Sequence, residues 1–428
     1  MKLSINKLLI SLPVFFFSAG LFAEVSFSGF AGAKAELSSS DTEKFEPALC
    51  MQSFFSGQFN LSENIISHAE FSLQTEDLID NSLFKNTPAT FRIDELSIIF
   101  RRQLLDATNY LSAFLGTYEP IGSDIFLRRQ FGIQPIASRL TESWLGLQGS
   151  VIYPTFGVGG ADVIHFNRQP LAVGLYLYVN HELDDCYSLN TDLRFAGVYR
   201  FFAFDFAGGL GMPLKENENQ DAFIVIDTLY GRAGINLLLG NSYTTSLFLQ
   251  AGITEVPFTK TDDISIDIKN TYLLFEPRFR TKKCQINITV FSLPQETVDG
   301  FKFVNDTEVR TITEADSHGV LYTENRFINI HDTLGLNIDI FTDNLYISNK
   351  AFEFGINTAW TFTDKTIKNL YEKPEDLLDD YNILVAPYVG TKFYNGEIHA
   401  MLQARVTDFI EDDVGSALSF NIGYKTQF

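Results

Sequence analysis

The chain ends in SFNIGYKTQF (residues 419–428), and this stretch decides which fold the rest of the sequence is tested against. Phe420, Ile422, Tyr424 and Phe428 share one parity, and polar or small residues occupy the other. Because a β-strand sends successive side chains to opposite faces, one face of this strand is apolar and the other is polar. Any half-buried strand shows such alternation, so the remainder of the chain has to decide between fold classes.

The beginning of the chain, MKLSINKLLISLPVFFFSAGLFA (residues 1–23), has the pattern of a secretory signal peptide. Lys2 and Lys7 precede an apolar centre, and small residues follow. Cleavage is expected after Ala23, with Gly20 as the alternative. A short transmembrane anchor is the competing interpretation, but the apolar run is shorter than the roughly 20 residues that a spanning helix needs. We therefore expect an exported chain whose residues 24–428 form one domain.

The composition argues against several classes of protein. Without the two signal-peptide lysines, 30 basic residues (32 − 2) stand against 53 acidic ones, a net charge of −23. Nucleic acid is not expected as a partner, because phosphate binding needs a basic surface. No later stretch has the continuous apolar run that a helical membrane protein requires. The sparse cysteines Cys50, Cys186 and Cys284 give no disulfide framework.

The alternation of the last stretch recurs along the whole chain. Its apolar parity continues for about 10 residues in segment after segment, which is the length of a tilted strand that crosses a bilayer. The pattern predicts 18 strands (range 16–20), at residues 24–37, 48–61, 64–76, 90–103, 109–119, 142–168, 170–182, 186–199, 201–213, 221–237, 242–254, 264–280, 283–294, 324–342, 350–362, 381–394, 397–409 and 415–428. Parity slips within 90–103 and 264–280 are interpreted as β-bulges.

The connections between these segments alternate in length. Short turns are predicted at 62–63, 200–201, 240–242, 281–283 and 395–396, and longer loops at 38–47, 77–89, 120–141, 214–220, 255–263, 295–323, 363–380 and 410–414. A connection at 343–349 is long for a turn. Transmembrane β-barrels have short periplasmic turns and longer outside loops. The sequence thus predicts an all-β, antiparallel transmembrane barrel with both termini in the periplasm.

A chain that ends on an aromatic residue after alternate apolar positions resembles the C-terminal assembly signal of bacterial outer-membrane β-barrel proteins, porins among them. In that family the last strand is recognised by the barrel-assembly machinery and closes the barrel against the first. The resemblance places Phe420, Ile422, Tyr424 and Phe428 in this signal. It also implies localisation in the cell outer membrane, contact with its lipid, and aromatic girdles, which here would rely on phenylalanine and tyrosine because the chain has only two tryptophans.

The third outside loop and its flanks, EPIGSDIFLRRQFGIQPIASRLTES (residues 119–143), concentrate opposed charges. In porin-like proteins this loop commonly folds inward and narrows the pore. The candidate constriction residues are Arg128, Arg129, Arg139, Asp124 and Glu119, with Glu142 beside them. Opposed charges across a narrow passage would orient and filter solutes. An exposed charged loop, or a short helix over the mouth, is the alternative.

Charged residues on the polar parity are expected on the lumen wall. They are Lys34, Glu70, Arg194, Lys392 and Arg405. The glycine-rich stretches 157–160 and 208–211 are interpreted as strand glycines rather than as nucleotide-binding loops. No motif supports catalysis, a metal site or a cofactor.

Three functions remain compatible with the sequence. The leading one is an outer-membrane porin, a transport channel for diffusion of small hydrophilic solutes or ions. The alternatives are a surface-exposed adhesin or structural barrel, and a hydrophobic transporter of the long-chain fatty-acid type. A homo-oligomer is left open.

Overall fold

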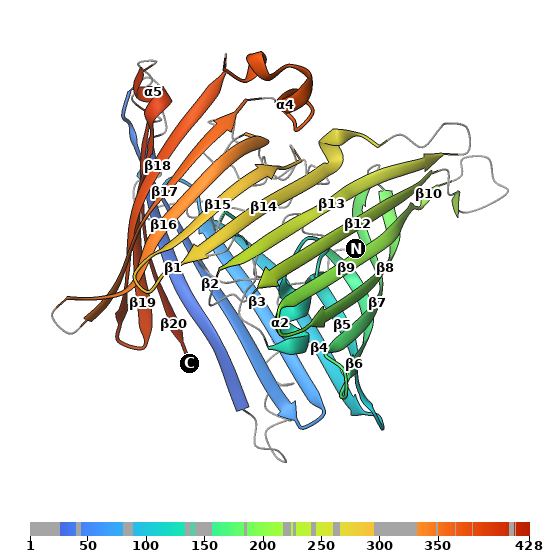
Figure 1. The fold of residues 1–428 in the computed structure, drawn as a ribbon. Coiled ribbons are helices and arrows are strands. Elements are labelled where there is room, and N and C mark those ends of the chain that lie inside the picture. Colours follow the sequence, from blue (N-terminus) through green and yellow to red (C-terminus); the bar gives the residue numbers. More distant parts are fainter. Residues whose placement is uncertain are drawn as a thin grey trace.

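The structure, a computed structural model, describes residues 26–39, 44–79, 89–132, 138, 140–141, 156–183, 186–216, 224–225, 228–240, 245–259, 266–294, 332–347, 350–363, 365–378, 380–410, 415 and 417–428. Eighteen of its strands form one sheet, in which each strand pairs with the next and β20 returns to β1 (Figure 1). All of the pairings are antiparallel, and β9 pairs directly with β12 because β10 and β11 form a separate small hairpin between them. The predicted 18-stranded antiparallel barrel is confirmed.

The strands of the barrel have the following bounds: β1 Ser26–Ser39, β2 Pro47–Ser62, β3 Ile65–Thr75, β4 Ala89–Gln103, β5 Ala107–Thr117, β6 Phe156–Phe166, β7 Leu171–Leu183, β8 Cys186–Val198, β9 Phe202–Pro213, β12 Thr228–Gly240, β13 Ser246–Thr259, β14 Thr271–Arg280, β15 Gln285–Ser292, β16 Leu334–Ile347, β17 Lys350–Phe362, β18 Tyr381–Phe393, β19 Gly396–Arg405 and β20 Leu418–Gln427. The small hairpin is β10 Lys215–Glu216 with β11 Ile224–Val225. The helices are α2 Ile125–Phe131, α4 Asn369–Glu372 and α5 Val406–Ile410, with 3-10 turns η1 Ile268–Asn270 and η2 Pro374–Leu378. No helix in these described ranges is long and apolar enough to cross a membrane.

Several predicted segments are corrected by the pairing. β16 continues to Ile347 through a register shift, so the connection expected at 343–349 shrinks to 348–349. The strand predicted at 324–342 corresponds to β16, which begins at Leu334. Of the strand predicted at 142–168, residues 142–155 lie outside the described residues. The bulge expected within 90–103 is confirmed, because β3 pairs with Glu95 and then with Ile93. The bulge expected within 264–280 is wrong, because η1 precedes a β14 that pairs in one continuous register.

The two ends of the barrel differ in their connections. At one end, here called the turn end, the hairpins are closed by short segments such as 63–64, 199–201, 281–284 and 394–395. The opposite loop end carries α4, η2 and α5, and the C-terminus lies at the turn end (Figure 1). This arrangement follows the predicted alternation of short turns and long loops.

The barrel is apolar outside and polar inside. On β8, Leu193 is 61% exposed, whereas its neighbour Arg194 is only 3% exposed. On β7, Leu175 and Leu177 face out and Tyr176 and Tyr178 face in. A soluble barrel would bury the leucines and expose the arginine. The observed arrangement pairs each strand with its neighbours in a closed sheet and presents hydrocarbon side chains outward, as lipid requires.

The seam between the first and last strands explains the aromatic C-terminus. β1 and β20 pair from Phe30↔Gln427 to Leu37↔Phe420. Beyond the ladder, Phe428 donates to and accepts from the backbone of Gly29, both at 3.0 Å, and its ring stacks on Phe27 with centroids 4.9 Å apart. Outward phenylalanines continue this contact along neighbouring strands: Phe55, Phe59, Phe71 and Phe91. The terminal residue is therefore part of both the closure and an outer aromatic row.

Candidate functional site

The segment from Tyr118 to Gly132, here called the inner segment, leaves β5 and turns into the barrel. Gly116 has φ 117° and Glu119 has φ 46°, so the backbone bends sharply where the strand ends. Glycine is suited to the first of these positions because a Cβ there would collide with the carbonyl of Asp94. α2 then ends at Gly132, a left-handed C-cap whose N–H donates to the carbonyl of Arg128.

Arg194, on the inward face of β8, holds the first part of the inner segment. Its Nη1 donates to the carbonyl oxygens of Glu119 (2.7 Å) and Pro120 (3.1 Å), and its Nη2 donates to that of Ser123 (2.7 Å). Its Nε donates to Asp205 Oδ1 of β9 at 2.9 Å. One buried guanidinium thus satisfies an adjacent carboxylate and three loop carbonyls, which would otherwise be costly to bury.

Amide side chains of the neighbouring strands extend this anchoring. Asn236 of β12 donates to the carbonyl of Ser123 at 2.8 Å, and Gln250 of β13 donates to that of Gly122 at 2.7 Å. Apolar contacts add to these bonds. Phe126 and Leu127 of α2 are fully buried among inward residues of the wall: Phe114, Tyr176, Tyr178, Leu238 and Phe248. The inner segment is therefore packed against the inside of β5–β13, not over the mouth.

Arg129 links α2 to strand β4, through Glu95. Its guanidinium lies 2.6 Å from Glu95 Oε2 and 3.6 Å from Glu119 Oε1, and it sits over the ring of Tyr118 at 4.9 Å. Burial disfavours the charged form of Arg129, but the carboxylates of Glu95 and Glu119 more than offset it and raise its pKa. Arg129 therefore stays charged.

Glu119 joins the two anchors. Its carboxylate accepts a hydrogen bond from the hydroxyl of Tyr176, and its backbone carbonyl is held by Arg194. Burial raises the pKa of Glu119, although Arg129 and the Tyr176 hydroxyl partly counter the shift. The carboxyl group is thus a buried junction of the network rather than a side chain presented to solutes.

The polar network extends from Arg129 along the wall. Glu95 accepts from Ser97 at 2.8 Å and lies 3.3 Å from His68 Nδ1. His68 Nε2 in turn lies 3.5 Å from Glu70, which accepts from Ser56 at 2.8 Å. Of the wall residues predicted from sequence, Glu70 therefore belongs to this network.

The other predicted wall residues have local partners or lie at a rim. Lys34 lies 3.5 Å from Glu36, and Arg405 lies 3.6 Å from Asp408. Arg194 is the anchor described above. Lys392 is exposed at the turn end of β18. The structure therefore does not gather these charges into one ring.

The predicted constriction residues are likewise separated. Asp124 is buried at the start of α2, and Arg129 is engaged with the wall. Arg128 is partly exposed, and none of the described residues forms an ion pair or hydrogen bond with its guanidinium. Arg139 and Glu142 lie outside the described residues. Of the predicted arginines in the described part, Arg129 and not Arg128 is paired with a carboxylate of the wall.

Apart from Arg194, which was expected on the lumen wall, the residues that hold the inner segment were not predicted from the sequence. Asp205 sits in a strand of phenylalanines, and Glu95 lies beside a bulge, so neither stands out as functional. Further along, Ser138 donates to Glu276 of β14, and Leu140 packs with Tyr272 and Phe291. The inward parity of acidic residues such as Glu95 and Glu276 was the available signal. Their partners Arg129 and Ser138 lie far from them in the sequence. The glycines of 157–160 and 208–211 lie in β6 and β9, as predicted.

A closed barrel with leucines outside and ion pairs inside has the lipid bilayer as its outer solvent. The protein has the architecture of a transmembrane β-barrel. No protein-family model and no curated protein sequence matches the chain.

Solved structures with a similar arrangement are outer-membrane barrels. Wzi of Escherichia coli, described as a carbohydrate-binding β-barrel involved in group 1 capsule assembly, is 9% identical, with 100% of this chain and 90% of Wzi covered and a TM-score of 0.44. OmpF of Salmonella typhi is 10% identical over 94% of this chain and 97% of its own, with a TM-score of 0.38. A mutant of the Rh. blastica porin is 6% identical over 94% and 100%, with a TM-score of 0.42. Similarity at this level concerns architecture and assigns no function to this chain.

Proposed function

We propose that the protein is a porin-like channel for diffusion of small hydrophilic solutes or ions, and that the inner segment narrows its lumen. The anchoring by Arg194 is the observation on which the proposal rests. A loop that only covered the mouth would not need a buried cation on the barrel wall to hold three of its carbonyl groups. The wall of β8–β13 instead carries a matching set of donors for this segment.

The wall on the other side of the barrel supports a hydrophilic solute. β1, β2, β19 and β20 turn charged and amide side chains inward: Lys34, Glu36, Gln52, Gln403 and Asn421. The apolar side chains of α2 are already covered by wall residues, so they do not line an apolar route. These features favour polar solutes over fatty acids.

Arg128 is the residue of the inner segment that we assign to the field in the passage. Because Glu119 and Asp124 are buried and Arg129 is paired with Glu95 of the wall, these residues position the segment, and we assign the action on passing ions to the charge of Arg128. A fixed charge at a narrow point acts over a few ångströms and is weakly screened at low salt. Arg139 remains a further candidate from the sequence.

Single-channel conductance in planar bilayers tests the proposal. The refolded barrel is compared with a variant in which residues 121–131 are replaced by a short glycine-serine linker. We expect the parent to conduct and the variant to conduct several-fold better, while both keep gel mobility that changes on boiling. If neither protein conducts, the channel is excluded and an adhesin or structural barrel takes its place. Equal conductance would exclude the inner segment as the constriction.

A further inference from the structure

Exposed cations are concentrated at the turn end of the barrel. The set, here called the basic rim, consists of Arg101, Arg102, Arg200, Arg280, Lys282, Lys283, Lys350 and Lys392. Two further cations at this end, Arg168 and Lys425, pair with Asp106 and Glu397. The enrichment runs against a chain whose formal net charge is −21.

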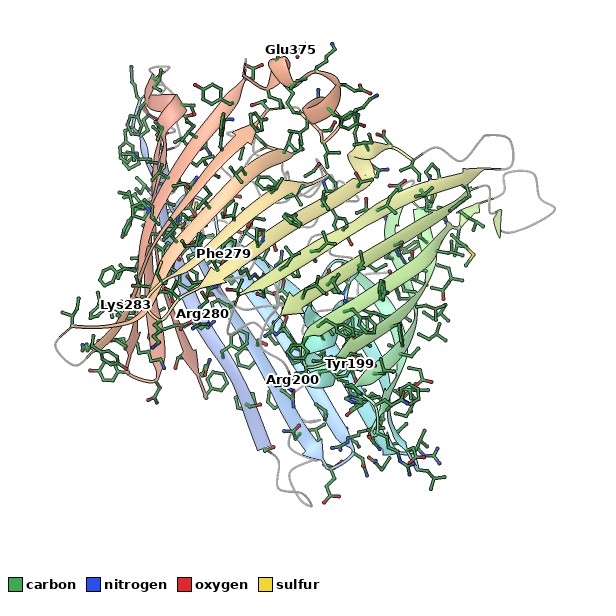
Figure 2. All side chains as sticks on the ribbon, viewed as in Figure 1. Tyr199, Arg200, Phe279, Arg280, Lys283 and Glu375 are labelled. Carbon is green, nitrogen blue, oxygen red and sulfur yellow. The ribbon has the colours of Figure 1, made fainter. Side chains whose placement is uncertain are left out.

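The loop end has a different charge character. Its short helical elements expose Glu372 and Glu375, and Lys368 there is paired with Glu372. Figure 2 shows the contrast: Arg200, Arg280 and Lys283 lie at the ends of strands near the turns, and Glu375 lies at the opposite end of the molecule. In the part of the barrel that the structure describes, exposed cations therefore prevail at the turn end.

Exposed aromatic rings accompany the basic rim. Phe201 is 66% exposed, Phe279 is 46% exposed and Tyr199 is 41% exposed. Arg200 lies over the ring of Phe201 at 5.0 Å, and Lys350 lies over the ring of Phe393 at 5.7 Å. Aromatic side chains of membrane barrels mark the boundary between hydrocarbon and headgroups. Cations in contact with such rings are at the depth of the lipid headgroups.

We propose that the basic rim binds the headgroups of anionic phospholipids in the leaflet that surrounds the turn end. Arginine guanidinium groups form paired hydrogen bonds with phosphate oxygens, and lysines supply further charge. Each cation near an anionic membrane surface contributes enough attraction to favour an anionic lipid over a neutral one by about two- to five-fold. The inference is independent of whether the lumen conducts.

Quenching by brominated lipids tests the inference, because the chain offers a reporter at each end. Trp360 on the outward face of β17 lies toward the loop end and serves as the first reporter, in a Trp144→Phe background. The second is Tyr199→Trp in a background with Trp144→Phe and Trp360→Phe. Full barrels are reconstituted in vesicles that mix phosphatidylcholine with phosphatidylglycerol, with one or the other lipid brominated. The ratio of quenching gives the preference for the anionic lipid near each tryptophan.

We expect a preference of about two- to five-fold at position 199 and about one at Trp360. Neutralising the rim with Arg200→Gln, Arg280→Gln and Lys283→Gln should bring the ratio at position 199 close to one, and so should about 1 M salt, where screening acts within about 3 Å. The matched control, Lys269→Gln with Lys368→Gln, removes exposed loop-end lysines and should leave the ratio unchanged. Equal ratios at the two ends, or a preference that survives neutralisation, would overturn the inference. The inference would also be wrong if neutralising the rim weakened the binding of an acidic protein and left the lipid preference unchanged.

Discussion

Replacing Arg194 by methionine should release the inner segment from the wall. The Arg194–Asp205 pair is almost fully buried, with side chains 2% and 1% exposed, so solvent screening is small. Removing one partner of a buried ion pair costs about 3–5 kcal/mol. The cost is relieved when the segment moves away and water reaches Asp205, so it favours release. Taking the lower figure of about 3 kcal/mol, the released population should rise about 100-fold.

Trypsin can measure this release, because Arg128 and Arg129 are cleavage sites within α2. When reclosing is fast, cleavage follows the population of the open form. We expect cleavage after Arg128 or Arg129 to be about 100-fold faster in Arg194→Met than in the parent, with fragments mapped by mass. The double variant Arg194→Met with Asp205→Asn removes the stranded charge and should be cleaved more slowly than the single variant.

The result that would refute this reasoning is specific. If Arg194→Met is cleaved within about three-fold of the parent rate while its gel mobility still changes on boiling, the buried pair does not hold the segment. A loss of the boiling-dependent shift would instead show that Arg194 is needed to fold the barrel. The double variant then distinguishes an unpaired carboxylate from a loss of other contacts. Asp205→Asn should restore the boiling-dependent shift only if the unpaired charge of Asp205 caused its loss.

Three further predictions concern charge, closure and protonation. Arg128→Ala should raise the preference for cations, seen as a shifted reversal potential in a KCl gradient near 0.1 M that fades toward about 1 M; an unshifted potential would remove Arg128 from the passage. Deleting Phe428 should lower the fraction of folded barrel, because the paired backbone bonds to Gly29 and the stacking on Phe27 are lost, whereas Phe428→Tyr should preserve it. Burial raises the pKa of Glu119 above its ordinary 4.5, so the folded barrel binds this proton more tightly than the unfolded chain, and stability should decrease as pH rises through the raised pKa. Glu119→Gln should flatten that part of a urea-unfolding profile, and an unchanged profile would contradict it.

The barrel could be predicted from sequence because its pattern is local. Each strand alternates with a period of two, and lipid makes the outward parity uniformly apolar, as Leu193 beside Arg194 illustrates. The closure of β1 on β20 agrees with what the resemblance of the C-terminal stretch to the assembly signal implied. Boundaries failed where another local structure continued the pattern, as η1 does before β14. The predicted number of strands was still correct, because such errors shift the end of a strand and do not add or remove a strand.

The partners of the inner segment could not be predicted in the same way. Arg194 and Asp205 share a hairpin, but the carbonyls that Arg194 holds come from more than 70 positions earlier in the chain. Arg128 and Arg129 are adjacent and chemically identical, yet only Arg129 reaches Glu95. The direction of a single helical turn separates Arg129, which is paired with the wall, from Arg128, which is not. Such a distinction depends on tertiary packing, which the local sequence pattern does not report.

The anchoring also shows where the geometry of the passage is encoded. A chain that runs inside a barrel must find donors for its own carbonyl groups, because buried backbone groups are costly when unpaired. Here those donors are side chains of β8, β12 and β13: Arg194, Asn236 and Gln250. They stand on a closed sheet and have fixed spacing, so they select one position for the inner segment. In the proposed channel, the width of the passage would therefore be set by the wall as much as by the loop, and substitutions in strands far from Arg128 should alter how its charge acts on a solute.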